Sequence, residues 1–112
     1  MGYDTAATSD VESVIPDEAG GMWFLKDALD TDHLGVTVLE LEAGQAGKPH
    51  DESETGQEEV YYVVDGTVAV DLEPETVTLE AGEAIRLDPE ERRQLENTGS
   101  EPATLVLAGA PL

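Results

Sequence analysis

One imidazole and several carboxylates lie within a short polar segment of this 112-residue chain. The candidate ligands are His50, Glu52, Glu54 and Glu59. One imidazole with two or three carboxylates is a mixed nitrogen and oxygen set that suits Mn, Fe, Ni or Zn. The segment therefore predicts a site for one divalent metal or for a small polar ligand.

Strand-like segments follow this polar loop. Residues 58–64 carry apolar side chains on both faces, which predicts a strand that is covered on both sides. Asp65-Gly66 separates this run from a second one at residues 67–72. A dipeptide of this kind between two apolar runs predicts a type I′ hairpin, with both turn residues at positive φ.

The rest of the chain is also divided into short strands. Further strands are expected at residues 35–42, 77–79, 83–87, 92–96 and 103–108, while residues 22–29 fit either an edge strand or a helical turn. Seven or eight short strands with regular turn signals indicate a β-sandwich or barrel. We expect residues 1–21 to form a loosely held polar N-terminal arm and residues 22–112 to form the single folded domain.

Two groups of residues resemble the two sequence motifs of the cupin superfamily. In the first, Gly44 and His50 have the family spacing, as do Glu59 and Gly66, but the second histidine is missing. In the second, Gly82 and Asn97 match at unbroken spacing, and Asp88, Glu90 and Arg93 replace the proline, glycine and histidine between them. The resemblance covers residues 34–111.

This resemblance implies an all-β fold, the cupin double-stranded β-helix or jelly-roll barrel. The family commonly binds one divalent metal through three histidines and one glutamate. The resemblance carries over His50 and Glu59 as ligands, with Glu54 or Glu52 in place of the second histidine. Arg93 stands where the family has its last histidine. A guanidinium has no lone pair to give to a metal, so the metal site is interpreted as degraded.

Alternation along a strand places Arg93 on one face with Leu95 and Asn97. Leu95 marks that face as buried, so we expect Arg93 to point into the barrel and to pair with Glu59 or Glu54. The candidate ligand-binding residues are Arg93 and Tyr61.

Each candidate has a simpler alternative. Glu52 and Glu54 are best interpreted as solvated loop acids, whereas His50 fits an ordinary loop histidine and a ligand equally well. Glu59 fits either a structural ion pair or a metal ligand, and Tyr61 fits a core or interface position. These alternatives leave open whether a metal is bound.

Composition narrows the classes of function. Twenty-six Asp and Glu against five Lys and Arg give a formal net charge of −21, spread along the whole chain. Such repulsion is screened in molar salt, which predicts a protein from the salt-adapted cytoplasm of a halophilic archaeon. The same charge argues against nucleic acids and anionic membranes as partners. The sequence has no cysteine and no apolar run that could span a membrane, and we expect its first residues not to form a signal peptide.

Three functions remain compatible with these observations. The first is a stand-alone cupin that binds or senses a small molecule without a tightly held metal. The second is a metal-dependent dioxygenase, isomerase or decarboxylase acting on a small polar substrate. The third is a structural or partner-binding protein. The resemblance implies a homodimer, as is usual for small cupins, and a second copy would also cover the second apolar face of residues 58–64.

Overall fold

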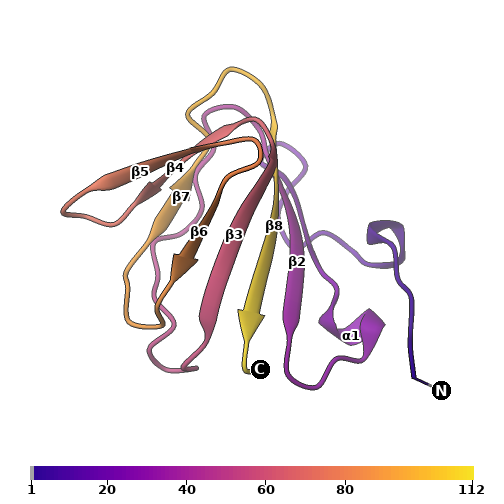
Figure 1. Cartoon of the computed structure of the whole chain (residues 1–112). Helices are drawn as coiled ribbons and strands as arrows, with labels where there is room; N and C mark the ends of the chain where they lie inside the picture. The colour runs from indigo at the N-terminus through magenta and orange to yellow at the C-terminus, as the bar shows by residue number, and fades with distance from the viewer. Residues whose placement is uncertain (1) are drawn as a thin grey trace.

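The computed structural model describes residues 2–112 and consists of two antiparallel sheets (Figure 1). In spatial order, the five-stranded sheet contains β1 (Gly20–Phe24), β2 (Gly35–Leu41), β8 (Ala103–Ala110), β3 (Glu58–Asp65) and β6 (Ala84–Leu87). The three-stranded sheet contains β5 (Thr76–Glu80), β4 (Thr67–Asp71) and β7 (Gln94–Glu96). A four-residue helix, α1 (Lys26–Leu29), and a 3-10 turn, η1 (Thr8–Asp10), complete the described elements.

The prediction of an all-β fold is confirmed. The segment at residues 22–29 contains both of the predicted alternatives, since the edge strand β1 ends at Phe24 and α1 follows directly. Neither α1 nor any other described helix has the length and apolar character required to cross a bilayer.

The core lies between the two sheets. Alternating side chains of neighbouring strands form a continuous apolar row, with Leu39 opposite Leu105 and Leu105 opposite Val63. Val68, Val70 and Leu95 of the three-stranded sheet belong to the same buried cluster. Burial of each such side chain contributes about 1.5–3 kcal/mol. The core therefore holds the two sheets together.

The hairpin predicted at Asp65-Gly66 is wrong. β3 pairs with β8 and β6, whereas β4 pairs with β5 and β7, so the two strands belong to different sheets. Gly66 has a φ of 92°, but Asp65 is not among the described residues with positive φ. A register shift between Val63 and Asp65 bends the end of β3. Asp65-Gly66 therefore leads the chain from one sheet into the other.

Gly66 is required by both its backbone conformation and its surroundings. A Cβ atom at this position would lie 2.9 Å from Cα and Cβ of Ala103. Gly82 has nearly the same φ, 90° against 92°, but nothing lies within 4 Å of its missing Cβ. We expect Gly82→Ala to cost about 1 kcal/mol through backbone strain alone, and Gly66→Ala to cost about 3 kcal/mol because it also overpacks the core.

Urea unfolding of the two variants at one fixed salt concentration measures this difference. Since both substitutions affect a glycine with positive φ, their difference isolates the contact with Ala103. Equal losses in stability would show that the strand end moves away from Ala103 at little cost.

The N-terminal segment is held more closely than the sequence suggested. β1 begins at Gly20, inside the segment assigned to the arm, and Ile15 packs against the core. The Ser13 hydroxyl accepts a hydrogen bond from the Met22 backbone N–H at 2.9 Å. Residues 13–21 are therefore attached to the domain beside β1 and β2 (Figure 1).

Asn97 fastens several segments to one another. Its side chain is fully buried, and Nδ2 donates to the backbone oxygens of Leu41 and Glu101, both at 2.9 Å. Its Oδ1 accepts a hydrogen bond from the Gly99 N–H at 2.9 Å. The asparagine that matches the second cupin-like motif thus has a structural role.

The outer face of β3 is not covered within one chain. Tyr61 and Val63 are buried, but the alternate side chains of Val60, Tyr62 and Val64 are 38%, 44% and 49% exposed. The prediction of apolar residues on both faces is confirmed, and the prediction of cover on both sides is not met by a single chain.

Candidate functional site in the barrel interior

Backbone pairing fixes the position of His50. The His50 N–H donates to the Arg93 oxygen and the Arg93 N–H donates to the His50 oxygen, both at 2.9 Å. The Gly47 N–H also donates to the Leu95 oxygen at 2.8 Å. The polar loop therefore runs antiparallel to the segment around β7. This pairing brings the histidine of the first motif next to the arginine of the second.

Glu59 enters the same region from the five-stranded sheet. It lies in β3 opposite Leu87 of β6 and Gly109 of β8. A Cβ atom at Gly109 would be only 3.4–3.5 Å from Cγ and Oε2 of Glu59, so the glycine leaves room for this carboxylate. The Tyr61 hydroxyl donates to Glu59 Oε1 at 3.2 Å. Strand alternation thus directs both side chains inward, as predicted for Glu59.

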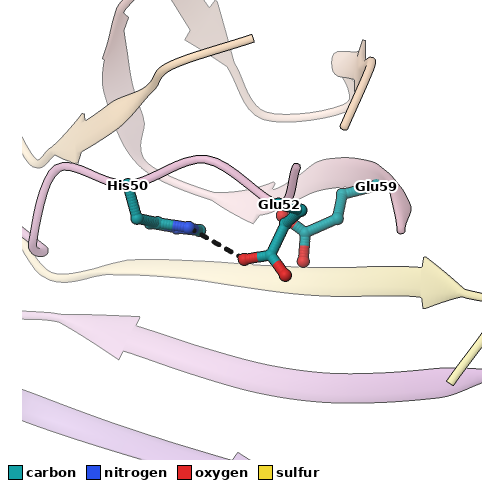
Figure 2. Close-up of side chains that lie close together, drawn as sticks. All are labelled: His50, Glu52 and Glu59. Atoms are coloured by element: carbon teal, nitrogen blue, oxygen red, sulfur yellow. Dashed lines mark ion pairs between the residues drawn. The ribbon is translucent and has the colours of Figure 1, made fainter. Parts of the chain in front are cut away.

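His50, Glu52 and Glu59 converge in one cluster (Figure 2). One possible ligand atom from each residue lies within 4.8 Å of the others. Glu52 is oriented from two sides, because its Oε2 lies 2.9 Å from His50 Nδ1 and its Oε1 accepts a hydrogen bond from Thr55 Oγ1 at 2.9 Å. The cluster can therefore present one imidazole and two carboxylates to a common point.

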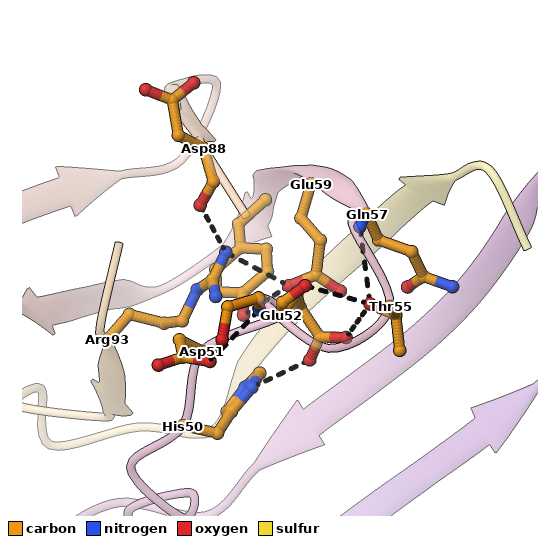
Figure 3. A network of polar contacts seen from close by, with 10 residues as sticks. His50, Asp51, Glu52, Thr55, Gln57, Glu59, Asp88 and Arg93 are labelled. Carbon is orange, nitrogen blue, oxygen red and sulfur yellow. Dashed lines mark hydrogen bonds and ion pairs between the residues drawn. The ribbon is translucent and has the colours of Figure 1, made fainter. Parts of the chain in front are cut away.

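Arg93 lies beside this cluster and is fully buried (Figure 3). Its Nη2 is 3.6 Å from Glu59 Oε1 and donates to the Asp88 backbone oxygen at 3.4 Å. Its Nε and Nη1 are buried without a hydrogen-bond partner among the described residues. The predictions that Arg93 points into the barrel and pairs with Glu59 are confirmed.

Burial changes the acidity of the two groups on β3. Desolvation raises the pKa of the Glu59 carboxyl above its usual value, although the positive charge of Arg93 acts in the opposite direction. Desolvation also raises the pKa of the Tyr61 phenol, and the neighbouring Glu59 carboxylate adds to this effect. Tyr61 is therefore a hydrogen-bond donor at neutral pH. In the loop, hydrogen bonds from Ser53 lower the pKa of Asp51.

A pocket of about 350 Å³ opens onto the cluster. Its polar wall includes His50, Glu52, Glu59 and Tyr61, and its apolar wall includes Phe24 and Leu107. A volume of this size accommodates a small metabolite. The fold thus brings the candidate ligands to the wall of a space that a small molecule can enter.

The sequence of residues 37–109 matches the Cupin_2 family, described as the cupin domain. The chain belongs to the cupin family. No curated protein matches its sequence. With the fold, the match confirms the predicted jelly-roll barrel.

Solved cupin structures share this fold. A cupin protein from Bacteroides fragilis is 20% identical, with a TM-score of 0.80 over 99% of this chain and 86% of that chain. A predicted oxalate decarboxylase from Thermotoga maritima is 22% identical, with a TM-score of 0.77 over 96% of this chain and 99% of that chain. The polyketide cyclase RemF from Streptomyces resistomycificus is 19% identical, with a TM-score of 0.76 over 96% and 78%. At these identities the likeness shows the fold alone.

Cupins often bind a divalent metal, and the cluster of His50, Glu52 and Glu59 could hold one. Neutral imidazole and carboxylate oxygen are suitable donors for such an ion. Arg93 would then be a fixed positive charge beside the ion, since its Nη2 is 3.6 Å from Glu59 Oε1. The donor set of this cupin fits a divalent metal, and the positive charge of Arg93 opposes it.

The structure brings together some of the predicted residues and separates others. Glu59, Arg93 and Tyr61 meet in the barrel interior, and His50 joins them from an exposed position in the loop. Glu54 is exposed in the loop and is not part of the cluster, where Glu52 takes the third place. The sequence signal for Glu52 was its position two residues after His50.

Proposed function

We propose that this cupin binds a small molecule without holding a tight divalent metal. The observation that carries the proposal is the buried guanidinium of Arg93, 3.6 Å from the carboxylate that a metal would need. Arginine keeps its proton at any relevant pH, so the positive charge cannot be removed. A buried charge that has lost its partner is costly, so Arg93 and Glu59 are expected to keep their ion pair.

Electrostatics sets the scale of the effect on a metal. At an effective dielectric constant of about 20, a divalent ion and a guanidinium about 5 Å apart repel each other by roughly 6–7 kcal/mol. This repulsion subtracts from the attraction that the two carboxylates of the cluster would exert on an ion. Glu59 also stabilises Arg93, so a metal that recruited this carboxylate would weaken the ion pair.

The metal content of protein produced without a histidine tag and purified in molar KCl tests the proposal. Elemental analysis should find well under one Mn, Fe, Ni or Zn per chain, also after incubation with equimolar metal and desalting. A retained stoichiometric metal that is lost in His50→Ala would overturn it.

The second candidate function is a metal-dependent enzyme. It is favoured by the cluster of His50, Glu52 and Glu59, whose ligand atoms lie within 4.8 Å of one another. In that case a bound divalent ion would supply Lewis-acid or redox chemistry. On this alternative, the protein would be a dioxygenase, isomerase or decarboxylase that acts on a small polar substrate. The measurement of metal content separates it from the proposed function.

We further propose that two copies associate through the outer face of β3. Val60, Tyr62 and Val64 form an exposed apolar row there. In the neighbouring strand β8, Val106 lies opposite Tyr62 and Ala108 lies opposite Val60, so the apolar row continues from β3 onto β8. A two-fold related copy would offer the same surface. Light scattering in molar KCl should give a dimer mass for the parent and a monomer mass for Tyr62→Glu, because a buried unpaired carboxylate opposes association. A monomeric parent would contradict this proposal.

We also propose that the protein functions in the cytoplasm of a salt-adapted organism. The net charge of −21 supports this setting and provides no basic surface for nucleic acids or anionic lipids.

A further inference from the structure

A second cavity, of about 490 Å³, is lined by the buried Arg93 and is called the inner cavity below. It adjoins the first pocket, since Met22, His50, Tyr61 and Leu107 line both spaces. Arg93 lines only this second cavity. The two adjoining spaces therefore differ in charge, since Glu52 and Glu59 line the first pocket and Arg93 lines the inner cavity.

The charge of the inner cavity is opposite to that of the protein. The described residues that line it include Lys48, His50 and Arg93 but no aspartate or glutamate. The chain has only five Lys and Arg against 26 Asp and Glu, and two of these five basic residues line this one space. In so acidic a protein, a cavity wall with basic residues and no acids favours a negatively charged occupant.

Most of the wall is apolar. Leu39, Leu41, Leu95 and Leu107 form its inner part, and Ile15 and Pro16 of the N-terminal segment close it. A small inorganic anion would leave these surfaces unfilled. An occupant with a hydrocarbon body would cover these surfaces and remove them from water, which is favourable.

Arg93, which lines this cavity, carries two buried donors without a partner in the described part of the chain. Its Nη2 is engaged by Glu59 and by the Asp88 backbone oxygen, whereas Nε and Nη1 have no partner among the described residues. A buried donor without an acceptor is costly, above all when it is charged, and a carboxylate oxygen that accepted from it would remove this cost. Glu59 already offsets part of the charge of Arg93, which favours a monoanion over a dianion.

We propose that the inner cavity binds a small organic monocarboxylate with an apolar body, its carboxylate held by Arg93 and its hydrocarbon part lying against the leucine wall. Lys48 assists at the rim. This proposal deepens the proposed function and rests on it, since it names the class of small molecule that the cupin binds.

Calorimetric titration with benzoate tests the proposal, with benzamide as the neutral probe of the same shape. Both titrations are made in molar KCl on the full chain. We expect benzoate to bind at least tenfold more tightly than benzamide, because a charge-assisted hydrogen bond contributes more than a neutral one. Equal affinities, or no binding of benzoate, would overturn the proposal without the use of any variant.

Two arginine variants locate the site. Arg93→Met should weaken benzoate binding at least tenfold. Arg92→Gln is the matched control, because it removes the same charge one residue away, where Arg92 is half-exposed and paired with Glu73 at 2.8 Å. Lys48→Gln, at an exposed position, should weaken binding a few-fold and leave the fold intact. If Arg92→Gln and Arg93→Met weaken binding equally, the effect is one of net charge and the assignment to the inner cavity is wrong.

These outcomes are distinguishable from failure of the proposed function. If the protein is free of metal but does not bind benzoate, only the proposed class of ligand is wrong. A protein that retains stoichiometric metal contradicts the proposed function, whatever benzoate does.

Discussion

Transfer from molar KCl to dilute buffer should unfold this protein. Its formal net charge is −21 over 112 residues, and the acidic residues occur in every part of the chain. In 1 M salt the Debye length is about 3 Å, so neighbouring surface carboxylates are screened from one another, whereas at about 50 mM it exceeds 10 Å. Since a small domain has only about 5–15 kcal/mol of stability, the unscreened repulsion is expected to exceed it.

Far-UV circular dichroism across a KCl series measures this loss of β structure. A variant with Glu75, Glu90 and Glu91 changed to lysine provides the control, because these exposed acids lie away from the barrel interior. It should stay folded at lower salt than the parent. A parent spectrum unchanged down to about 50 mM KCl would contradict salt adaptation.

Arg93→His should convert the barrel interior into a metal site. The substitution removes the cation that lies 3.6 Å from Glu59 and adds an imidazole beside His50, with which residue 93 is paired through its backbone. Four donors would then surround one point. We expect affinity for Zn or Ni to rise at least a hundredfold, or about 2.7 kcal/mol.

Arg93→Gln and Arg92→His are the two controls for this prediction. The first removes the charge but supplies no imidazole, so it should gain only part of the affinity. The second adds an imidazole at a half-exposed position outside the cluster and should gain little. A rise in metal affinity as large in Arg92→His as in Arg93→His would show that the metal binds at the surface. Circular dichroism of each variant verifies that it is folded.

Local sequence patterns predicted the strands well because the alternation of side chains along a strand reflects which face is buried. The alternation of Arg93, Leu95 and Asn97 predicted which face is buried, and all three side chains are buried. The inward direction of Glu59 followed from the same reasoning. Spacing shared with the cupin motifs then predicted that Arg93 and Glu59 would meet, although 34 positions separate them in sequence.

Other features depend on contacts that no local pattern reports. Asp65-Gly66 has the composition of a hairpin turn, but β3 pairs with β8 near the C-terminus, so the chain after Gly66 continues in the other sheet. The choice of Glu52 over Glu54 depends on the loop path, which the Glu52 N–H fixes by donating to the Pro89 oxygen at 2.7 Å. Ile15 in the polar N-terminal segment gave no periodic signal, yet it reaches the core.

A crystal structure with anomalous data collected at the absorption edges of Mn, Fe, Ni and Zn tests the central claim most directly. The protein should be crystallised from molar salt without a histidine tag. We expect the Arg93 guanidinium to lie beside Glu59 and no anomalous peak to lie between His50, Glu52 and Glu59. A full-occupancy anomalous peak at that point, with Arg93 turned away from Glu59, would contradict the claim and favour the metal-dependent enzyme.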